Sequence, residues 1–373
     1  MRTLEFVVYP RIFNELGGLR DMRIVFPLLS IRHHGGVRVI IHIANYLASR
    51  GHTVMLITPA DRFAPLYEID RRVGVYLTRP VGNLSYVSHL LNISRLYFSM
   101  DHSDFIVPNF FPTFYPAFLA SRRGKGHLVY LVQDYEPFFY GGLTRIVSEL
   151  TYKFRADVIA VSHWLARRIG KHARRVKVIP PGPQDGVFYP DEVPELIKDA
   201  EYPVILYMWR YEKRKGSAVF AEAVRLLSRE GRHFELWLVF SGKKPIRIDI
   251  DRPVKLFGPV KDNRLRQLYS CADIFVNASY YEGFGLPPLE AMACGTPAVL
   301  TRSGGVEEYA VDGLNSLLVP PGDPHKLADA IEKLIFNERL RRKLAANALE
   351  TAERFSLNKM AREVEEFLIE LTG

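Results

Sequence analysis

Cysteine is nearly absent from this chain of 373 residues, which contains only Cys271 and Cys294. Two cysteines cannot build a disulfide framework, and neither has a partner at the spacing of a metal site. Such sparse cysteine is typical of the reducing cytoplasm, where we expect the protein to reside, and we expect no bound metal.

Long apolar runs are absent as well. No stretch supplies the roughly 18 uncharged apolar residues that a membrane-spanning helix needs. The N-terminal sequence lacks the basic-then-apolar order of a signal peptide. Because Met22 resembles a natural start, we interpret residues 1–21 as an N-terminal extension. Apolar residues make up 48% of the chain, which is enough for two hydrophobic cores and too many for a disordered protein.

Acidic residues are scarce in the first half of the chain. Residues 22–185 contain 21 Lys or Arg against 10 Asp or Glu, whereas residues 186–373 contain 26 against 28. This asymmetry indicates an anionic partner of the first half, either an anionic membrane surface or an anionic acceptor. Ordinary solubility charge is the alternative. A membrane partner would place the protein at the inner face of the cell membrane. No nucleic-acid-binding motif is present, and we expect no such partner.

Short apolar runs alternate with amphipathic helical patterns, which predicts parallel sheets made of βαβ units. In the first half, the strand DMRIVFPLL leads to a helix with Val39, Ile43 and Leu47 on one face, and then to the strand VMLIT. Further strands are expected at 104–109, 127–134, 157–162 and 176–182.

The second half repeats this alternation after a proline-rich, acidic stretch. Strands are expected at 204–210, 234–240, 254–258, 273–279, 297–301 and 315–320, and helices at 216–229, 263–271, 324–335 and 337–371. The predicted organisation is an extension (1–21), an N-terminal domain (22–185), a linker (186–202), a C-terminal domain (203–355) and a helix (356–373) that packs back on the N-terminal domain.

The stretch YYEGFGLPPLEAMACGTP (280–297) holds two acids eight positions apart. Its Gly-Phe-Gly turn (283–285) lets backbone amides approach a ligand, and the Pro-Pro pair suits the first turn of a helix. Glu282 would precede that helix and Glu290 would lie in or near its first turn, with exposed amides between them. The alternatives are a solvated turn acid at Glu282 and a dipole-stabilised helical acid at Glu290.

A second candidate site is WRYEKRKGS (209–217), which connects a strand to a helix N-terminus. A guanidinium binds phosphate with two parallel hydrogen bonds and an ammonium adds a point charge, which favours Arg210 and Lys215 as phosphate ligands. The spacing does not match a Walker loop, and a solvated basic run is the alternative.

Three further candidates lie in the first half. Gly35 and Gly36 in HHGGVR suit a tight turn after the first strand, and the neighbouring His33 and His34 are expected at the surface. The stretch VQDYEPFFYGG (132–142) places acids and aromatic rings after a strand, as in carbohydrate sites, with a buried aromatic cluster and capping acids as the alternative. The stretch SHWLARRIGKHARR (162–175) predicts a basic helix, either at a membrane surface or simply solvated.

The string EGFGLPPLEAMACGTPAV resembles the acid-x7-acid signature of the family-4 retaining glycosyltransferases. Other segments resemble this family in the same order, namely GGVRVIIHIANYLASRGHTVMLIT, VIAVSHWLA, VKVIPPGPQDGVF, RYEKRKG, VKLFGPV and GLNSLLVPPGDPHKLADAI. The resemblance covers most of the chain from Met22. It implies the α/β GT-B fold, with two facing Rossmann-like domains, parallel sheets and an interdomain cleft. The string QDYEPFFY is similar to some bacterial rhamnosyltransferases of polysaccharide assembly.

The resemblance also implies roles for individual residues. Arg210 and Lys215 would hold the donor diphosphate, and Glu290 would bind the ribose. The family often has a histidine where this chain has Gln133, so the acceptor-side role falls to Gln133 or Asp134. The remaining implied contacts are Glu282 and the backbone of Gly283, Phe284, Gly285 and Leu286 to the donor sugar and distal phosphate, Phe257, Gly258 and Val260 to the base, and Gly36 beneath the diphosphate.

The activity implied is transfer of a hexose from a nucleotide-diphospho-sugar to a hydroxyl of a glycan or lipid-linked acceptor. The anomeric configuration would be retained, and neither a metal nor a cofactor beyond the donor would be needed. Three alternatives stay open at this point. They are a nucleotide-sugar epimerase of the same fold, a phosphorylase-type enzyme that would need pyridoxal phosphate, and a non-catalytic nucleotide-sugar-binding protein.

Overall fold

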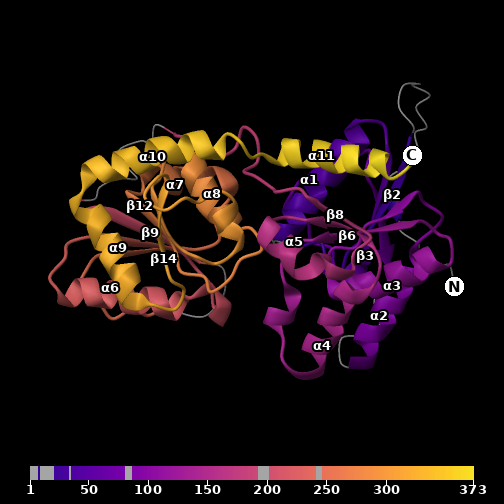
Figure 1. Cartoon of the computed structure of the whole chain (residues 1–373), viewed down its shortest axis with the longest axis horizontal. Helices are drawn as coiled ribbons and strands as arrows, with labels where there is room; N and C mark the ends of the chain where they lie inside the picture. Colours follow the sequence, from indigo (N-terminus) through magenta and orange to yellow (C-terminus); the bar gives the residue numbers. More distant parts are fainter. Residues whose placement is uncertain (1–6, 9–20, 33–34, 80–85, 192–200, 241–245) are drawn as a thin grey trace. The chain divides into compact units, whose positions relative to one another are not determined.

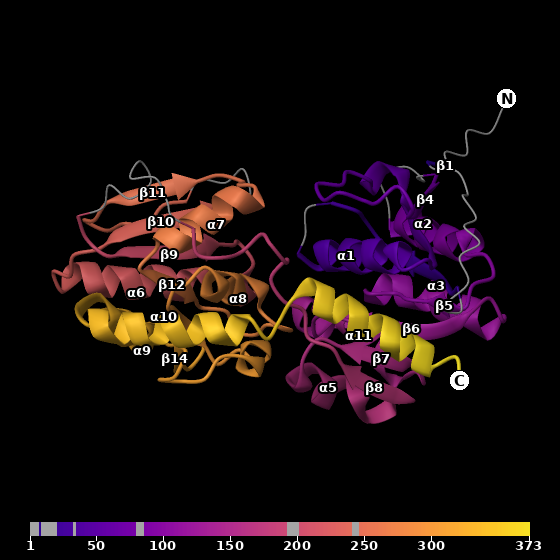
Figure 2. The ribbon, with the colours of Figure 1, turned by 90° about the horizontal axis from the view of Figure 1, so that it is seen from above.

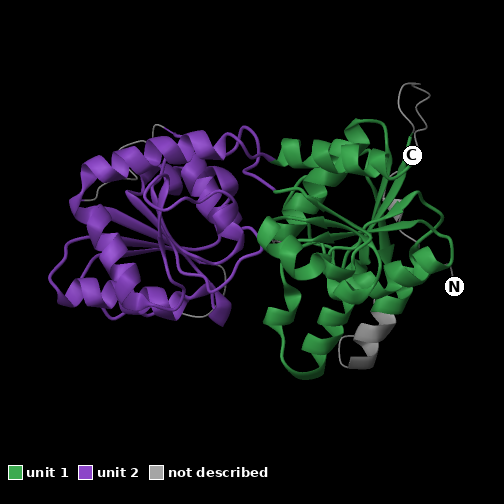
Figure 3. Ribbon diagram, viewed as in Figure 1, with its two compact units in different colours: residues 1–180, 357–373 green, residues 181–356 purple. Residues whose placement is uncertain are grey.

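A computed structural model of the chain describes residues 7–8, 21–32, 35–79, 86–191, 201–240 and 246–373. The chain forms two compact units (Figure 3). Unit 1 consists of residues 1–180 and 357–373, and unit 2 consists of residues 181–356. Most of the predicted extension (1–21), most of the predicted linker (186–202), and His33 and His34 lie outside the described residues.

Unit 1 contains a sheet in the order β1-β4-β3-β2-β5-β6-β7-β8, in which neighbours are parallel except for β1 against β4. The strands are β1 (Val7–Val8), β2 (Arg23–Pro27), β3 (Thr53–Pro59), β4 (Gly74–Thr78), β5 (Phe105–Ile106), β6 (His127–Val132), β7 (Asp157–Ala160) and β8 (Arg175–Val178). The helices are α1 (Gly35–Ser49), α2 (Tyr86–Ser99), α3 (Phe111–Arg122), α4 (Gly142–Leu150), α5 (His163–Ile169) and α11 (Leu357–Glu370), with short 3-10 turns η1 (Ala60–Arg62), η2 (Glu136–Phe139), η3 (Thr151–Lys153) and η4 (Gly170–His172).

The C-terminal helix α11 lies side by side with α1 in two views (Figures 1 and 2). The buried carboxylate of Glu365 anchors it, with Oε1 3.0 Å from Nε2 of His52 and 3.3 Å from Nε of Arg50. Apolar residues of α11, including Val364 and Leu368, are buried. The last helix of the chain is therefore an integral part of unit 1.

Unit 2 contains a fully parallel sheet in the order β11-β10-β9-β12-β13-β14. The strands are β9 (Val204–Trp209), β10 (Glu235–Phe240), β11 (Val254–Phe257), β12 (Ile274–Asn277), β13 (Ala298–Thr301) and β14 (Ser316–Val319). The helices are α6 (Ser217–Arg229), α7 (Asp262–Cys271), α8 (Leu286–Ala293), α9 (Pro324–Phe336) and α10 (Glu338–Ala352), with 3-10 turns η5 (Lys213–Lys215) and η6 (Gly305–Glu308). The central strands are buried on both faces, as their continuous apolar runs predicted.

Strand order locates the ligand-binding edge of each sheet. In unit 2 the chain builds outward from β9 through β10 to β11, and then returns to the other side of β9 with β12. In unit 1 the same reversal occurs between β2 and β5. Ligands of open α/β sheets bind at such a switch point, beyond the carboxyl ends of the strands. The residues that follow β9 and β12, and those that follow β2 and its neighbours, are therefore the candidates.

The α/β class and the parallel sheets predicted from the sequence are confirmed. The helix predicted over 162–175 was wrong in its length. Helix α5 ends at Ile169, a 3-10 turn begins at Gly170, and Arg175 already belongs to β8. The strand predicted over 104–109 is reduced to Phe105–Ile106. Among the described residues, none of the helices has the length and apolar character required to cross a bilayer.

Candidate functional site

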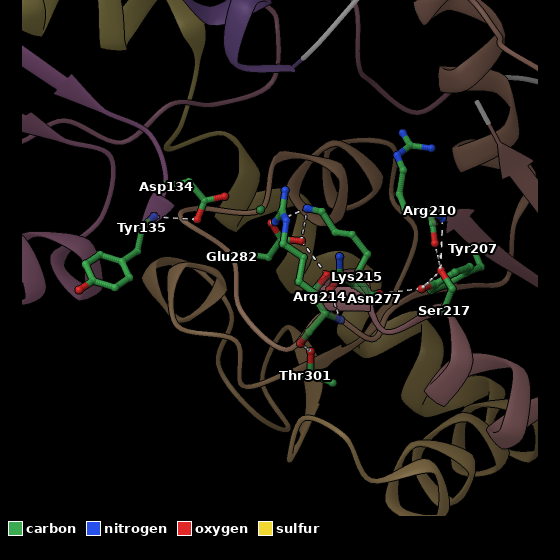
Figure 4. Close-up of polar contacts among 12 residues, drawn as sticks. Asp134, Tyr135, Tyr207, Arg210, Arg214, Lys215, Ser217, Asn277, Glu282 and Thr301 are labelled. Carbon is green, nitrogen blue, oxygen red and sulfur yellow. Dashed lines mark hydrogen bonds and ion pairs between the residues drawn. The ribbon is translucent and has the colours of Figure 1, made fainter. Parts of the chain in front are cut away.

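The carboxyl ends of β9 and β12 bring a lysine and a glutamate together (Figure 4). Nζ of Lys215, in the turn after β9, donates to both carboxylate oxygens of Glu282 at 2.8 Å. Glu282 follows β12 and is 6% exposed, and the Lys215 side chain is 22% exposed. The predicted phosphate-binding cation and the predicted donor-binding acid thus form one ion pair at the switch point of the sheet.

The turn that carries Lys215 is held in place by its neighbours. The hydroxyl of Tyr207 donates to the carbonyl of Lys215 at 2.9 Å, and the Ser217 hydroxyl donates to the carbonyl of Arg210 at 2.6 Å. Gly216 has φ +69°, and a Cβ at this position would lie 1.9 Å from the carbonyl oxygen of Ala278. Only glycine lets the two strand ends approach so closely. The position of the ammonium therefore depends on this glycine.

Glu282 is kept ionised although it is buried. Burial by itself raises the pKa of its carboxyl, but the charges of Lys215 and Arg214 and the hydrogen bonds from Lys215 and Ser279 bring the pKa below its usual value. The Ser279 hydroxyl, which is also buried, donates to Oε1 of Glu282 at 2.7 Å. Ser279 is itself fixed through its carbonyl, which accepts from the hydroxyl of Thr301.

Arg214 was missed in the sequence, although it lies in the basic run that was recognised. Its Nη1 is 4.0 Å from Oε2 of Glu282, and its guanidinium is 5.9 Å from the ring centre of Tyr281. Arg210, in contrast, lies apart from this group in Figure 4 and donates from Nη1 to the carbonyl of Trp209 at 3.0 Å. The structure thus groups Arg214 and Lys215 with Glu282, but does not group Arg210 with them. Its position next to Lys215 was the one feature of the sequence that indicated a role for Arg214 in the site.

Glu290 lies on α8 and is 3% exposed. The helix begins at Leu286, with Pro287 in its first turn as expected. Glu290 is therefore the fifth residue of the helix and belongs to its second turn rather than its first. A buried acid at this position is not a simple solvated residue that compensates the helix dipole.

The turn from Gly283 to Leu286 is packed tightly against a second glycine turn. Gly283, Phe284 and Gly285 are all buried, and Gly285 has φ +90° at the start of α8. A Cβ on Gly305 would lie 2.3 Å from the carbonyl carbon of Gly283. Gly305 was not recognised in the sequence, because its partner lies in a separate loop. The side chain of Phe284 packs on the rings of Tyr309 and Phe355.

The three residues expected near the base lie at the outer edge of the same sheet. Phe257 ends β11, and Gly258 and Val260 follow it. All three are partly buried, and the ring centre of Phe257 is 5.5 Å from that of Trp237. Strand β10 lies between β11 and β9, so these residues are separated from the Lys215–Glu282 pair by one strand of the sheet.

In unit 1, Gly36 at the start of α1 and Gln133 after β6 are brought together. Gly36 is the second residue of α1, and Nε2 of Gln133, which follows β6, donates to its carbonyl at 3.1 Å. A Cβ on Gly36 would lie 2.4 Å from Oε1 of Gln133. Gln133 thus occupies the space that the glycine leaves open at the edge of this sheet.

The acids after β6 have different environments. Asp134 is half-buried and accepts from the amide of Tyr135 at 2.9 Å. Glu136 is buried, and its Oε2 accepts from the amide of Phe111, the first residue of α3, at 2.8 Å. Burial raises the pKa of Glu136 well above its usual value. Glu136 is therefore a buried acid that caps α3 beside aromatic rings, which was the alternative interpretation of this stretch. Asp134 lies at the edge of the sheet.

Within the ranges that the structure describes, no group of three or more His, Cys, Asp or Glu side chains is arranged to hold a metal ion. The polar groups at the two sheet edges are cations, single carboxylates, amides and glycine backbone. Such groups can bind phosphate and sugar hydroxyls directly.

Each half of the chain matches a known protein family. Residues 33–183 match the family described as Glycosyltransferase Family 4, and residues 189–351 match the family described as Glycosyl transferases group 1. A D-inositol 3-phosphate glycosyltransferase of Acidothermus cellulolyticus is 30% identical over 236 residues, which cover 57% of this chain and 52% of that protein. The chain therefore spans about half the length of the curated relatives it matches.

Solved structures share the fold over almost the whole chain. Sucrose-phosphate synthase of Thermosynechococcus elongatus has a TM-score of 0.79 at 22% identity, covering 94% of this chain and 99% of that one. The Anabaena protein HepE, solved in complex with UDP-glucose, has a TM-score of 0.77 at 21% identity, covering 93% and 99%. The two family matches, in this order and on this fold, show that the chain belongs to the glycosyltransferases of the GT-B fold, with a family 4 domain followed by a group 1 domain.

Proposed function

We propose that this chain transfers a hexose from a nucleotide-diphospho-sugar to a hydroxyl of a glycan or lipid-linked acceptor, without a metal ion and with retention of the anomeric configuration. The observation that carries the proposal is the Lys215–Glu282 pair, with Arg214 beside it, at the switch point of the unit 2 sheet. Two cations face one carboxylate there, which leaves positive charge for a diphosphate.

The chemical step that we propose is a front-face displacement. The bond between the anomeric carbon and the diphosphate oxygen breaks, and a bond from the acceptor oxygen forms on the same face. The acceptor proton passes to the departing phosphate oxygen. Negative charge grows on the diphosphate during this step, so cations held in place beforehand lower the barrier. Lys215, Arg214 and Arg210 would supply that charge.

The remaining roles follow the resemblance to family-4 glycosyltransferases. Glu290 would bind the ribose, and the turn from Gly283 to Leu286 would contact the distal phosphate and the sugar. Gly36 of unit 1 would lie beneath the diphosphate, and Gln133 and Asp134 would act on the acceptor side. The Gly36–Gln133 contact supports this assignment, because it keeps a small backbone position and an amide side chain together at a strand end.

The test is a panel of nucleotide-diphospho-sugars scored by release of nucleoside diphosphate, with and without glycan acceptors. We expect one donor to give release that rises with acceptor and is unchanged by a chelator. An epimerase would convert the donor with no acceptor present. A binding protein would bind the donor, for example UDP-glucose, and release nothing. Either result would refute the proposal.

A further inference from the structure

Helix α4 leaves its apolar side uncovered. Leu143, Ile146 and Leu150 are 70%, 56% and 40% exposed, and their spacing of three and four places them on one face. Ser148 is the one buried residue of α4. Scattered apolar residues on a surface are ordinary, but a continuous apolar helix face marks an interaction site.

This face is part of the folded unit. The hydroxyl of Tyr115, on α3, donates to the carbonyl of Val147 at 2.6 Å, so α4 is tied to its neighbour by its other side. Phe138, in η2, is 36% exposed and belongs to a segment that packs against α4. Figure 1 shows α4 at the lower edge of unit 1, away from the sheet. We call Phe138, Leu143, Ile146 and Leu150 the α4 face.

Basic side chains adjoin the α4 face. The segment 153–177 contains eight Lys or Arg, all exposed, and a single acid, Asp157, which is buried and paired with His127 and Arg174. Its first part, η3, packs against both α4 and η4, so Lys153 lies on a turn next to the end of α4, and Lys171 lies on the turn that adjoins η3. The guanidinium of Arg168 is 5.2 Å from the ring centre of Phe138.

The basic residues beside the α4 face indicate which partner binds it. A two-fold dimer through α4 would bring the same basic segment of two copies together, and like charges would oppose it. An anionic bilayer offers the opposite charge, and apolar side chains beside basic ones are the pattern of helices that lie in the headgroup layer. Glu149, the one acid on α4, is half-buried.

We propose that the α4 face enters the headgroup layer of an anionic membrane and presents unit 1 to a lipid-linked acceptor, an inference whose acceptor class rests on the proposed function. The membrane contact predicted for residues 162–175 thereby moves to a different helix. In α5, Leu165 and Ile169 are buried and Trp164 is partly buried, so this helix lacks the exposed apolar side that α4 has.

The test is flotation of the full chain with vesicles of phosphatidylcholine, alone or with phosphatidylglycerol. We expect binding to the anionic vesicles, weakened by salt because the basic contacts are screened. The triple variant Leu143→Ser, Ile146→Ser, Leu150→Ser should lose about tenfold or more of its partition coefficient. The control is Leu66→Ser, since Leu66 is 69% exposed but lies outside α4, and it should bind as the native chain does.

Equal binding by the triple variant and the native chain would overturn the inference, as would absence of native binding to either vesicle. A native dimer that the triple variant lacks would show that a second copy covers the α4 face instead. Circular dichroism confirms that the variant folds. Release of nucleoside diphosphate with a water-soluble acceptor should be the same in both proteins. If no donor gives release of nucleoside diphosphate in either protein, the proposed function is refuted. The vesicle experiment still tests the membrane contact of the α4 face independently.

Discussion

Lys215 binds Glu282 through both carboxylate oxygens, each 2.8 Å from Nζ. The ammonium comes from the turn after β9 and the carboxylate from the turn after β12, so the ion pair spans the switch point of the unit 2 sheet. A diphosphate bound there would compete with Glu282 for the same ammonium. Glu282 therefore positions Lys215, and we expect donor binding to redistribute this contact.

Removing a cation that we propose for the diphosphate should slow the reaction. We expect Lys215→Ala and Arg210→Ala each to reduce turnover about 100-fold or more, because charge that grows on the diphosphate loses its partner. The measurement is release of nucleoside diphosphate at saturating donor. Lys213→Ala is the matched control, since Lys213 is exposed in the same turn. Rates close to normal in both variants would contradict the assignment.

The Glu282 ion pair should make stability depend on pH in acid. Its folded pKa lies below the unfolded value, so its contribution is full above pH 4.5 and is lost as pH falls through the folded pKa. Glu282→Gln should lower the unfolding free energy by about 3 kcal/mol at pH 7, with a smaller difference below pH 4.5. Urea unfolding followed by tryptophan fluorescence, to which Trp209 and Trp237 of unit 2 contribute, measures this. A difference constant down to about pH 3 would contradict it.

Glu136 should show the opposite dependence. Because burial raises its folded pKa, the folded chain takes up this proton before the unfolded chain does, and stability is gained as pH falls toward 4.5. Glu136→Gln keeps an oxygen for the Phe111 amide and carries no charge, so it should be more stable than the native chain at pH 8. Thermal melts at pH 8 and pH 5 test this, and a less stable variant at both values would show that the carboxylate is needed.

Two adjacent glycines offer a matched pair in unit 1. Gly36→Ala would place a Cβ 2.4 Å from Oε1 of Gln133, whereas Gly35→Ala meets nothing within 4 Å. Since the Gln133 side chain can move, Gly36→Ala should leave the melting temperature almost unchanged and lower the transfer rate about tenfold or more through a displaced amide. Gly35→Ala should change neither. Equal rates in the two variants would remove Gln133 from the acceptor side.

Local pattern was sufficient for the elements of the fold. Continuous apolar runs predicted the buried parallel strands of both sheets, and Val39, Ile43 and Leu47 predicted α1, because a strand buried on both faces and a helix with one apolar side each leave a short-range periodicity. The helix boundary at Ile169 was missed, since basic residues suit a helix, a turn and an edge strand alike. The Gly-Phe-Gly turn and the two prolines correctly placed the start of α8.

Contacts between distant segments were decided by tertiary structure alone. Position 305 must be glycine because the backbone of Gly283 lies against it. Glu365 contacts His52 across 313 positions, and Arg214 rather than Arg210 lies beside Glu282. Leu165 and Ile169 of α5 are buried, whereas Leu143, Ile146 and Leu150 of α4 are exposed, although both helices look amphipathic. The sequence alone determined which residues suit strands, helices and turns, because those preferences are local. Only the packing of the chain decided which face is covered and which charges meet, because burial depends on segments that no local pattern connects.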